Sequence, residues 1–184
     1  MSSIQAQFPN LGNHHSRYPD IDPMTKLKGS ASGKTVFLSG ASRGIGQAVA
    51  VAFAQAGADA VYITARSEKE LEETKAGITA ANPETRCAYM VCDVTDAKQV
   101  TAAVDDCVSK FGGIDIADAN AGYLDKWGKI GESDIASWWW SWEVNIKGAY
   151  YVVRFCLPHL IESARKRSAL GSTGGYMILM SSVG

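Results

Sequence analysis

The stretch that decides the fold is SGASRGIG, residues 39–46. It follows an apolar run with strand composition, residues 34–39, and leads into an alanine-rich run with helix composition, residues 47–56. Glycine permits tight backbone conformations and close approach of a phosphate, and a helix N-terminus favours an anion. The stretch therefore predicts a phosphate-binding turn, and the alternative is a turn that only lets the helix pack on the sheet. Its glycines are Gly40, Gly44 and Gly46.

The same alternation continues along the chain. Further strands are expected at residues 60–65, 86–92, 114–119 and 176–181, and further helices at residues 67–81, 96–111 and 134–165. Ser67 and Asp96 are suited to cap the first two of these helices. Crossover helices force neighbouring strands to be parallel and cover both faces of the sheet. The predicted fold class is therefore α/β, a doubly wound parallel sheet of Rossmann type, which binds ligands at the carboxyl ends of its strands.

Length and composition set broad limits on function. The chain has 184 residues, a net charge of −1 and 46% hydrophobic residues, which suits one globular domain and no nucleic-acid partner. We expect residues 1–32 to form an extended N-terminal arm and residues 33–184 to form the nucleotide-binding domain. No run is apolar enough for a secretory leader or a membrane span, so we expect a cytoplasmic protein with reduced cysteines. We expect no metal site, and His14 and His15 are read as part of the polar arm.

The end of the second predicted strand indicates the cofactor. In dinucleotide-binding folds the residue at this place reads the ribose, and a carboxylate there favours NAD. Here Arg66 follows the strand, and Arg43 in the glycine turn can reach the same region. Guanidinium groups suit a 2′-phosphate, so the sequence favours NADP(H). Two alternatives stay open: both arginines are solvated surface charges, or nearby Glu68 favours NAD.

Several motifs in order resemble the short-chain dehydrogenase/reductase family. They are the GxxxGxG spacing of the turn, Asn120-Ala-Gly122, Asn145, and the serine pair at residues 181–182, so the resemblance runs from Lys34 to Gly184. The arm and the Trp-rich stretch are most similar to fungal members. The resemblance implies hydride transfer between NADP(H) and a carbonyl or alcohol of a small substrate, such as a secondary metabolite.

The resemblance also assigns individual residues. Asp93 would contact the adenine and Asn120 would lie near the cofactor ribose, although Asp118 and Ala119 depart from the common pattern and affect how that strand end is held. Ser182 would hold the substrate oxygen, and Asn145 would anchor a water of the proton relay. The expected cofactor-binding set is Gly40, Ser42, Arg43, Gly44, Ile45, Gly46, Arg66, Asp93, Val94, Asn120 and Gly122.

The family's Tyr-x-x-x-Lys motif would come after Gly184. Relative to the family, the sheet is therefore expected to be incomplete at the C-terminus, with residues 176–180 as an apolar edge strand that favours aggregation. Three interpretations follow: an oxidoreductase represented by a short chain, a non-catalytic NADP-binding or partner protein, or a defective truncated gene product.

The long helix begins with four tryptophans in five residues, residues 138–142. Trp138 and Trp142 should share a face, because residues four apart are neighbours on a helix. They either pack against the sheet and a partner helix or form an aromatic platform for a substrate. The resemblance implies that this helix contributes to a homo-oligomer.

Overall fold

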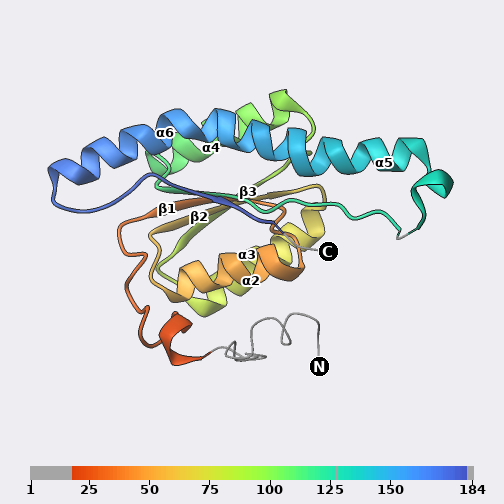
Figure 1. Ribbon diagram of the computed structural model, residues 1–184. Helices are drawn as coiled ribbons and strands as arrows, with labels where there is room; N and C mark the ends of the chain where they lie inside the picture. The colour runs from red at the N-terminus through yellow and green to blue at the C-terminus, as the bar shows by residue number, and fades with distance from the viewer. Residues whose placement is uncertain (1–17, 127, 182–184) are drawn as a thin grey trace, which may run out of the picture.

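The computed structural model describes residues 18–126 and 128–181. Five parallel strands form one sheet in the order β3-β2-β1-β4-β5, and helices cover both faces (Figure 1). This confirms the doubly wound α/β fold, with the order reversing direction after β1. The strands are β1 (Thr35–Ser39), β2 (Ala60–Ala65), β3 (Arg86–Val91), β4 (Ile116–Ala119) and β5 (Tyr176–Leu179).

The helices divide between the two faces of the sheet. In Figure 1, α2 (Gly44–Gln55) and α3 (Glu68–Ala81) lie below the sheet, and α4 (Ala97–Phe111) and α6 (Ala149–Ala169) lie above it. Both expected caps are confirmed: Ser67 Oγ accepts a hydrogen bond from Glu70 N at 3.4 Å, and Asp96 Oδ1 accepts one from Lys98 N at 2.8 Å. These caps fix where α3 and α4 begin.

Some element boundaries differ from the expectation. Helix α2 begins at Gly44, so two glycines of the turn belong to its first turn. Strand β4 begins at Ile116, because Ile114 packs into the core without joining the ladder. The long helix was expected over residues 134–165, but it is made of α5 (Ile135–Trp142), a π-helical segment η3 (Glu143–Gly148) and α6, and it ends at Ala169.

The sheet separates two cores. Phe37 and Tyr62 face α4 and α6, and their rings stack with centroids 5.7 Å apart. Leu38 and Ile63 face the opposite way, toward α2 and α3. Every residue of β1 and β2 is buried, whereas β5 at the edge of the sheet is largely exposed. The buried central strands thus support the loops that follow their carboxyl ends.

The described part of the N-terminal arm folds back on the domain. It contains a short 3-10 helix η1 (Pro19–Ile21) and a series of turns, so this part is not extended as expected. Ala31 is buried, and its N–H donates a hydrogen bond to Ala56 O at 3.1 Å. The arm therefore caps the C-terminal end of α2.

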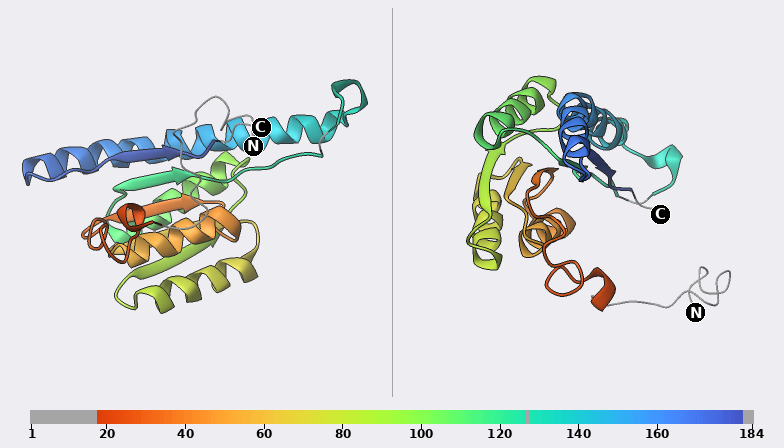
Figure 2. Two further views of the ribbon diagram at one scale, coloured as in Figure 1. Left: turned by 60° about the horizontal axis from the view of Figure 1, so that its bottom comes forward. Right: turned by 90° about the vertical axis from the view of Figure 1, so that its left-hand side faces the viewer.

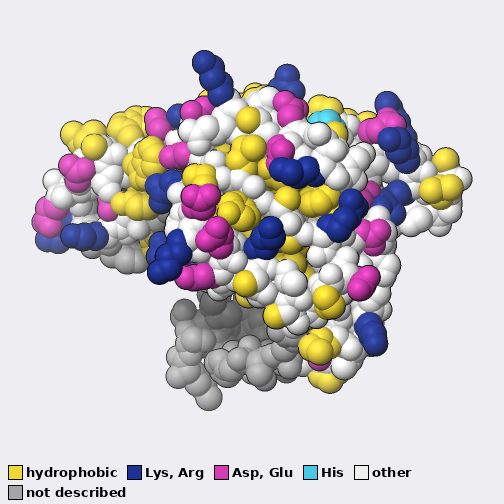
Figure 3. Space-filling model, turned by 180° about the vertical axis from the view of Figure 1, so that it is seen from behind, with side chains coloured by type: hydrophobic (Ala, Val, Ile, Leu, Met, Phe, Trp, Pro, Cys, Tyr) yellow, Lys and Arg dark blue, Asp and Glu magenta, His cyan; other side chains and the backbone are white. Residues whose placement is uncertain are grey.

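Helix α5, which contains the four tryptophans, extends beyond the sheet (Figure 2). Trp138 and Trp142 share a face as expected, with ring centroids 5.6 Å apart. Trp140 packs against the core, whereas Trp139 and Trp142 are exposed. Hydrophobic side chains gather on this end of the molecule, while charges of both signs are interspersed over the rest of the face (Figure 3).

None of the helices among residues 18–126 and 128–181 is long and apolar enough to cross a membrane.

Candidate functional site

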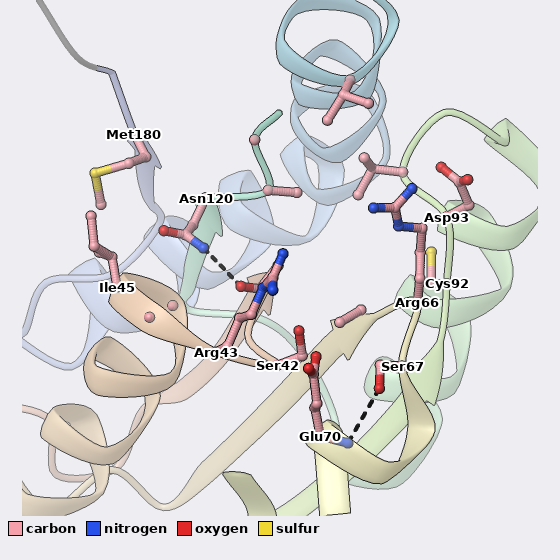
Figure 4. A pocket seen from close by; sticks show the side chains of 18 residues that line it. Ser42, Arg43, Ile45, Arg66, Ser67, Glu70, Cys92, Asp93, Asn120 and Met180 are labelled. Atoms are coloured by element: carbon pink, nitrogen blue, oxygen red, sulfur yellow. Dashed lines mark hydrogen bonds between the residues drawn. The ribbon is translucent and has the colours of Figure 1, made fainter. Parts of the chain in front are cut away.

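A cavity of about 540 Å³ lies at the carboxyl ends of the central strands (Figure 4). Its wall contains the glycine turn after β1 and the residues that follow β2, β3 and β4. All eleven residues expected to bind the cofactor line this one cavity. Loops that follow different strands therefore converge as the doubly wound fold requires.

Each of the three glycines of the turn occupies its position for a different structural reason. Gly40 has φ +68°, and a Cβ there would lie 2.6 Å from the Cα of Ala121. A Cβ on Gly46 would overlap the Gly40 carbonyl oxygen and the Asn120 amide. Gly44 has φ +60° but faces open space. Two glycines thus let the turn pack tightly, and the third leaves room on the cavity side for a ligand.

Asn120 fixes this turn to the end of β4. Its Nδ2 donates hydrogen bonds to Ser39 O at 3.1 Å and Gly40 O at 3.0 Å. The Ala121 N–H adds a hydrogen bond to Ser39 Oγ at 3.3 Å. These contacts connect the ends of two neighbouring strands. In this structure Asn120 therefore stabilises the turn.

The strand end also contains a buried carboxyl group without a partner. Asp118 is 1% exposed, and its Oδ1 has no hydrogen-bond partner among the described residues. Burial raises the pKa of Asp118 to about 6. Asp118 is one of the two residues, with Ala119, at which a departure from the common pattern was expected, and its buried carboxyl group adds no tie to the strand end.

Apart from Asp93 of the loop after β3, three charged side chains line the cavity. Arg43 and Arg66 line it as expected, and Glu70 in the first turn of α3 lines it as well. None of the three charged groups forms an ion pair or a hydrogen bond within the described residues. Helix α2 also begins without a side-chain cap. The free donors at this end of the sheet suit an anionic ligand.

The third strand contributes the adenine end of the expected site. Asp93 Oδ1 accepts hydrogen bonds from Thr95 N at 2.9 Å and Thr95 Oγ1 at 2.8 Å, which holds the loop after β3 in place. Val94 packs closely on the long helix, because a Cβ on Gly148 would lie 2.7 Å from Val94 Cγ2. Burial raises the pKa of the Cys92 thiol to about 12, with Asp93 and Asp96 adding to the effect, so this cavity residue stays protonated.

Sequence reasoning missed seven residues of the cavity wall. The Ser67-x-x-Glu70 spacing is a sequence signal for a capping box and could have placed Glu70 at the first turn of α3. Met180 follows β5, so the fifth strand reaches the same cavity. The missed residues are Ala65, Ser67, Glu70, Cys92, Ala121, Val144 and Met180.

Of the two expected catalytic residues, the structure describes Asn145 but not Ser182. Asn145 lies in the π-helical segment, and its side chain holds the backbone of Tyr123: Oδ1 accepts from Tyr123 N and Nδ2 donates to Tyr123 O, both at 2.8 Å. It lies beside Gly122, at the border of the cavity rather than in its wall. π-Helical segments inside α-helices are frequent at functional sites. Ser182 lies outside the described residues.

Comparison with known proteins identifies the family. The family model described as short chain dehydrogenase matches residues 34–183. The chain is 40% identical over 168 residues to the short chain dehydrogenase mpl6 of Monascus purpureus, covering 89% of this chain and 56% of that protein. The chain therefore belongs to the short-chain dehydrogenase family, and it spans about half the length of the curated relatives it matches.

Solved structures agree with this assignment. Carveol dehydrogenase from Mycobacterium avium in complex with NAD matches with a TM-score of 0.68 and 29% identity, covering 73% of this chain and 52% of the other. An alcohol dehydrogenase from Thermococcus sibiricus complexed with 5-hydroxy-NADP matches with a TM-score of 0.67 and 30% identity, covering 71% and 55%. Similar structures therefore hold nicotinamide cofactors with and without the 2′-phosphate.

Proposed function

We propose that this chain is the cofactor-binding part of an NADP(H)-dependent oxidoreductase acting on a carbonyl or alcohol of a small substrate, such as a secondary metabolite. The observation that carries the proposal is the single cavity at the strand ends, lined by the glycine turn and two unpaired arginines. Such a cofactor, when bound, supplies or accepts the hydride. Membership of the short-chain dehydrogenase family supports the reaction class.

The residues present fit a dinucleotide. The open backbone at Gly44 and the uncapped start of α2 would hold the pyrophosphate. Arg43 and Arg66 would hold the 2′-phosphate through charge-assisted hydrogen bonds. Asp93 would bind the adenine, because its Oδ2 accepts no hydrogen bond within the described residues. The electrostatic character of the cavity thus favours NADP(H) over NAD(H).

For the reacting end, we propose that Asn145 is a positioning residue and that Ser182 holds the substrate oxygen. Both hydrogen bonds of the Asn145 side chain fix Tyr123, and the π-helical turn alters the backbone hydrogen bonding around Asn145. This arrangement would keep the loop after β4 and the long helix at a constant separation. A substrate bound near Met180 would then meet a fixed wall.

We also propose that the long helix mediates self-association. Its exposed apolar residues follow one face of the helix: Trp142, Ile146, Tyr150, Leu157 and Ile161. Contiguous exposed apolar surface of this kind marks interaction sites. Sedimentation at micromolar concentration tests this, and a monomer would contradict it.

The cofactor proposal is tested by titrating the protein with NADP⁺ and NAD⁺. We expect Arg66→Gln to weaken NADP⁺ about tenfold, the equivalent of one exposed charge-assisted hydrogen bond, with NAD⁺ little changed. Arg154→Gln is the matched control, because Arg154 is exposed on α6 and outside the cavity. An unchanged ratio of the two affinities in Arg66→Gln would show that Arg66 does not read the 2′-phosphate.

A further inference from the structure

Glu70, the third residue of α3, does not make the contact that its sequence pattern predicts. With Ser67 as the N-cap, the sequence Ser67-Glu-Lys-Glu70 forms the pattern of a capping box, in which the glutamate reaches back to the N-cap N–H. Only half of the box forms here. The Ser67 hydroxyl accepts from the Glu70 N–H, but neither carboxylate oxygen of Glu70 accepts a hydrogen bond within the described residues.

The Glu70 side chain points into the cavity instead. Figure 4 shows its carboxylate directed toward the hydroxyl of Ser42, with Arg43 on one side and Arg66 on the other. The side chain is half-buried, and no ion pair with either arginine forms. The Glu70 carboxylate and the two guanidinium groups thus line the same space without forming ion pairs, whereas Asp93, the other acid of the cavity wall, is held by hydrogen bonds from Thr95.

The charges of this cavity favour different ligands. A 2′-phosphate carries up to two negative charges, which the arginines attract and a nearby carboxylate repels. A ribose with a free 2′-hydroxyl carries no charge there and can donate a hydrogen bond to a carboxylate. The arginines therefore favour NADP(H), whereas Glu70 opposes its phosphate and is compatible with NAD(H).

We propose that Glu70 is a cofactor-specificity residue. Its carboxylate reduces the preference that Arg43 and Arg66 give to the 2′-phosphate, so the site accepts NAD(H) as well as NADP(H). This inference rests on the proposed function, because it concerns the choice of nucleotide in the same cavity. It differs from the expectation at Glu68, which is exposed and does not line the cavity.

The test compares Glu70→Gln with Glu68→Gln in titrations with NADP⁺ and NAD⁺. Glutamine is equally suited to the third position of a helix, so α3 should be retained, and circular dichroism checks this. Both variants remove one negative charge from the same helical turn, but only Glu70 lines the cavity. We expect Glu70→Gln to strengthen NADP⁺ binding about fivefold to tenfold at low salt, with NAD⁺ unchanged or weaker.

Salt dependence separates charge repulsion from a structural effect. The difference between wild type and Glu70→Gln should shrink toward zero in about 1 M salt, where charges several ångströms apart are screened. Equal shifts in Glu70→Gln and Glu68→Gln would overturn the proposal, as would equal changes for both nucleotides. If the wild type binds neither nucleotide, the cofactor site itself is wrong, and this inference is wrong with it.

Discussion

The two ends of the parallel sheet differ in whether their charged groups are paired within the protein. At the amino-terminal end, Asp115 receives hydrogen bonds from Arg167 Nε at 2.5 Å, Arg167 Nη2 at 2.8 Å, Ser163 Oγ at 2.5 Å and Thr35 N at 2.7 Å. Arg167 also donates to the Gly33 carbonyl oxygen. This network joins the start of β1, the approach to β4 and the end of α6.

At the carboxyl-terminal end, Asp93 is hydrogen-bonded to Thr95, but four other charged groups have no such partners among the described residues. Arg43, Arg66 and Glu70 face a common cavity, and the buried Asp118 keeps an orphaned oxygen. Internal pairing stabilises the fold, whereas unpaired donors remain available to a ligand. From this difference we infer that the amino-terminal end of the sheet contributes mainly to stability and that the carboxyl-terminal end serves the proposed nucleotide binding. Stability and nucleotide affinity should therefore respond to different substitutions.

The largest expected effect comes from Gly46→Ala. An alanine in place of a helical glycine normally stabilises a protein by about 1 kcal/mol. Here the new Cβ would overlap Gly40 O and the Asn120 amide, so the turn and α2 must move apart. We expect nucleotide affinity to fall by at least about 100-fold, which corresponds to roughly 3 kcal/mol. Calorimetric titration and urea unfolding measure both effects.

Gly77→Ala is the matched control for this substitution. Gly77 lies within α3, and a Cβ there would meet only Val51 Cγ2 at an ordinary 3.5 Å. We expect it to stabilise the protein by about 1 kcal/mol and to leave binding unchanged. If Gly46→Ala behaves like Gly77→Ala, the tight packing of the turn does not govern binding.

The second prediction concerns the hydrogen-bonded network around Asp115 at the amino-terminal end of the sheet. Burial opposes ionisation of Asp115, but hydrogen bonds from Arg167, Ser163 and Thr35 outweigh it and lower its pKa. Arg167→Ala would leave a largely buried carboxylate without its main partner, so we expect a loss of about 2–3 kcal/mol in unfolding free energy at pH 7. A lowered pKa stabilises above the unfolded value, so this loss should shrink as the pH falls below about 4.

The comparison also requires that nucleotide binding survive Arg167→Ala, since the network lies at the opposite end of the sheet from the cavity. Lys26→Ala is the control, because its ion pair with Asp20 is highly exposed and should contribute less than about 1 kcal/mol. A matching loss of nucleotide affinity in folded Arg167→Ala would show that the two ends are not independent.

The sequence predicted the fold and the cavity wall well for a physical reason. Alternating strands and helices restrict the sheet to a few parallel arrangements, and in each of them the loops that follow the strands lie at the same edge of the sheet. Residues such as Arg66 and Asn120 could therefore be placed by their position after a strand. The direction of a side chain could not be predicted in this way. Glu70 lies in the first turn of α3 rather than directly after β2, and its rotamer decides whether it caps the helix or faces the cavity.

Two further features depend on tertiary contacts rather than on local pattern. The π-helical segment around Asn145 has no composition that distinguishes it from an α-helix, and its hydrogen bonds to Tyr123 need the loop after β4 in place. The isolation of Asp118 likewise depends on what surrounds β4. The sequence shows an acid within an apolar strand, but not whether a donor reaches it.

Asp118→Val is the smallest of these effects and sharpens the contrast with Asp115 most directly. Because burial raises the pKa of Asp118 to about 6, the folded state binds more protons than the unfolded state between about pH 4 and 6. Stability should therefore fall as the pH rises through this range, opposite in sign to the contribution of Asp115. Valine fits a buried strand and removes the orphaned charge, so we expect a gain of about 2 kcal/mol at pH 7 and almost none at pH 4.

Urea unfolding of the wild type and of Asp118→Val at pH 4, 5, 6 and 7 measures this gain. A gain that grows with pH would show that the binding end of β4 carries a charge that the fold does not compensate. An equal gain at every pH would mean that valine only improves packing. In that case the unpaired acid would not be what distinguishes this end of the sheet, and the contrast would rest on Arg43, Arg66 and Glu70 alone.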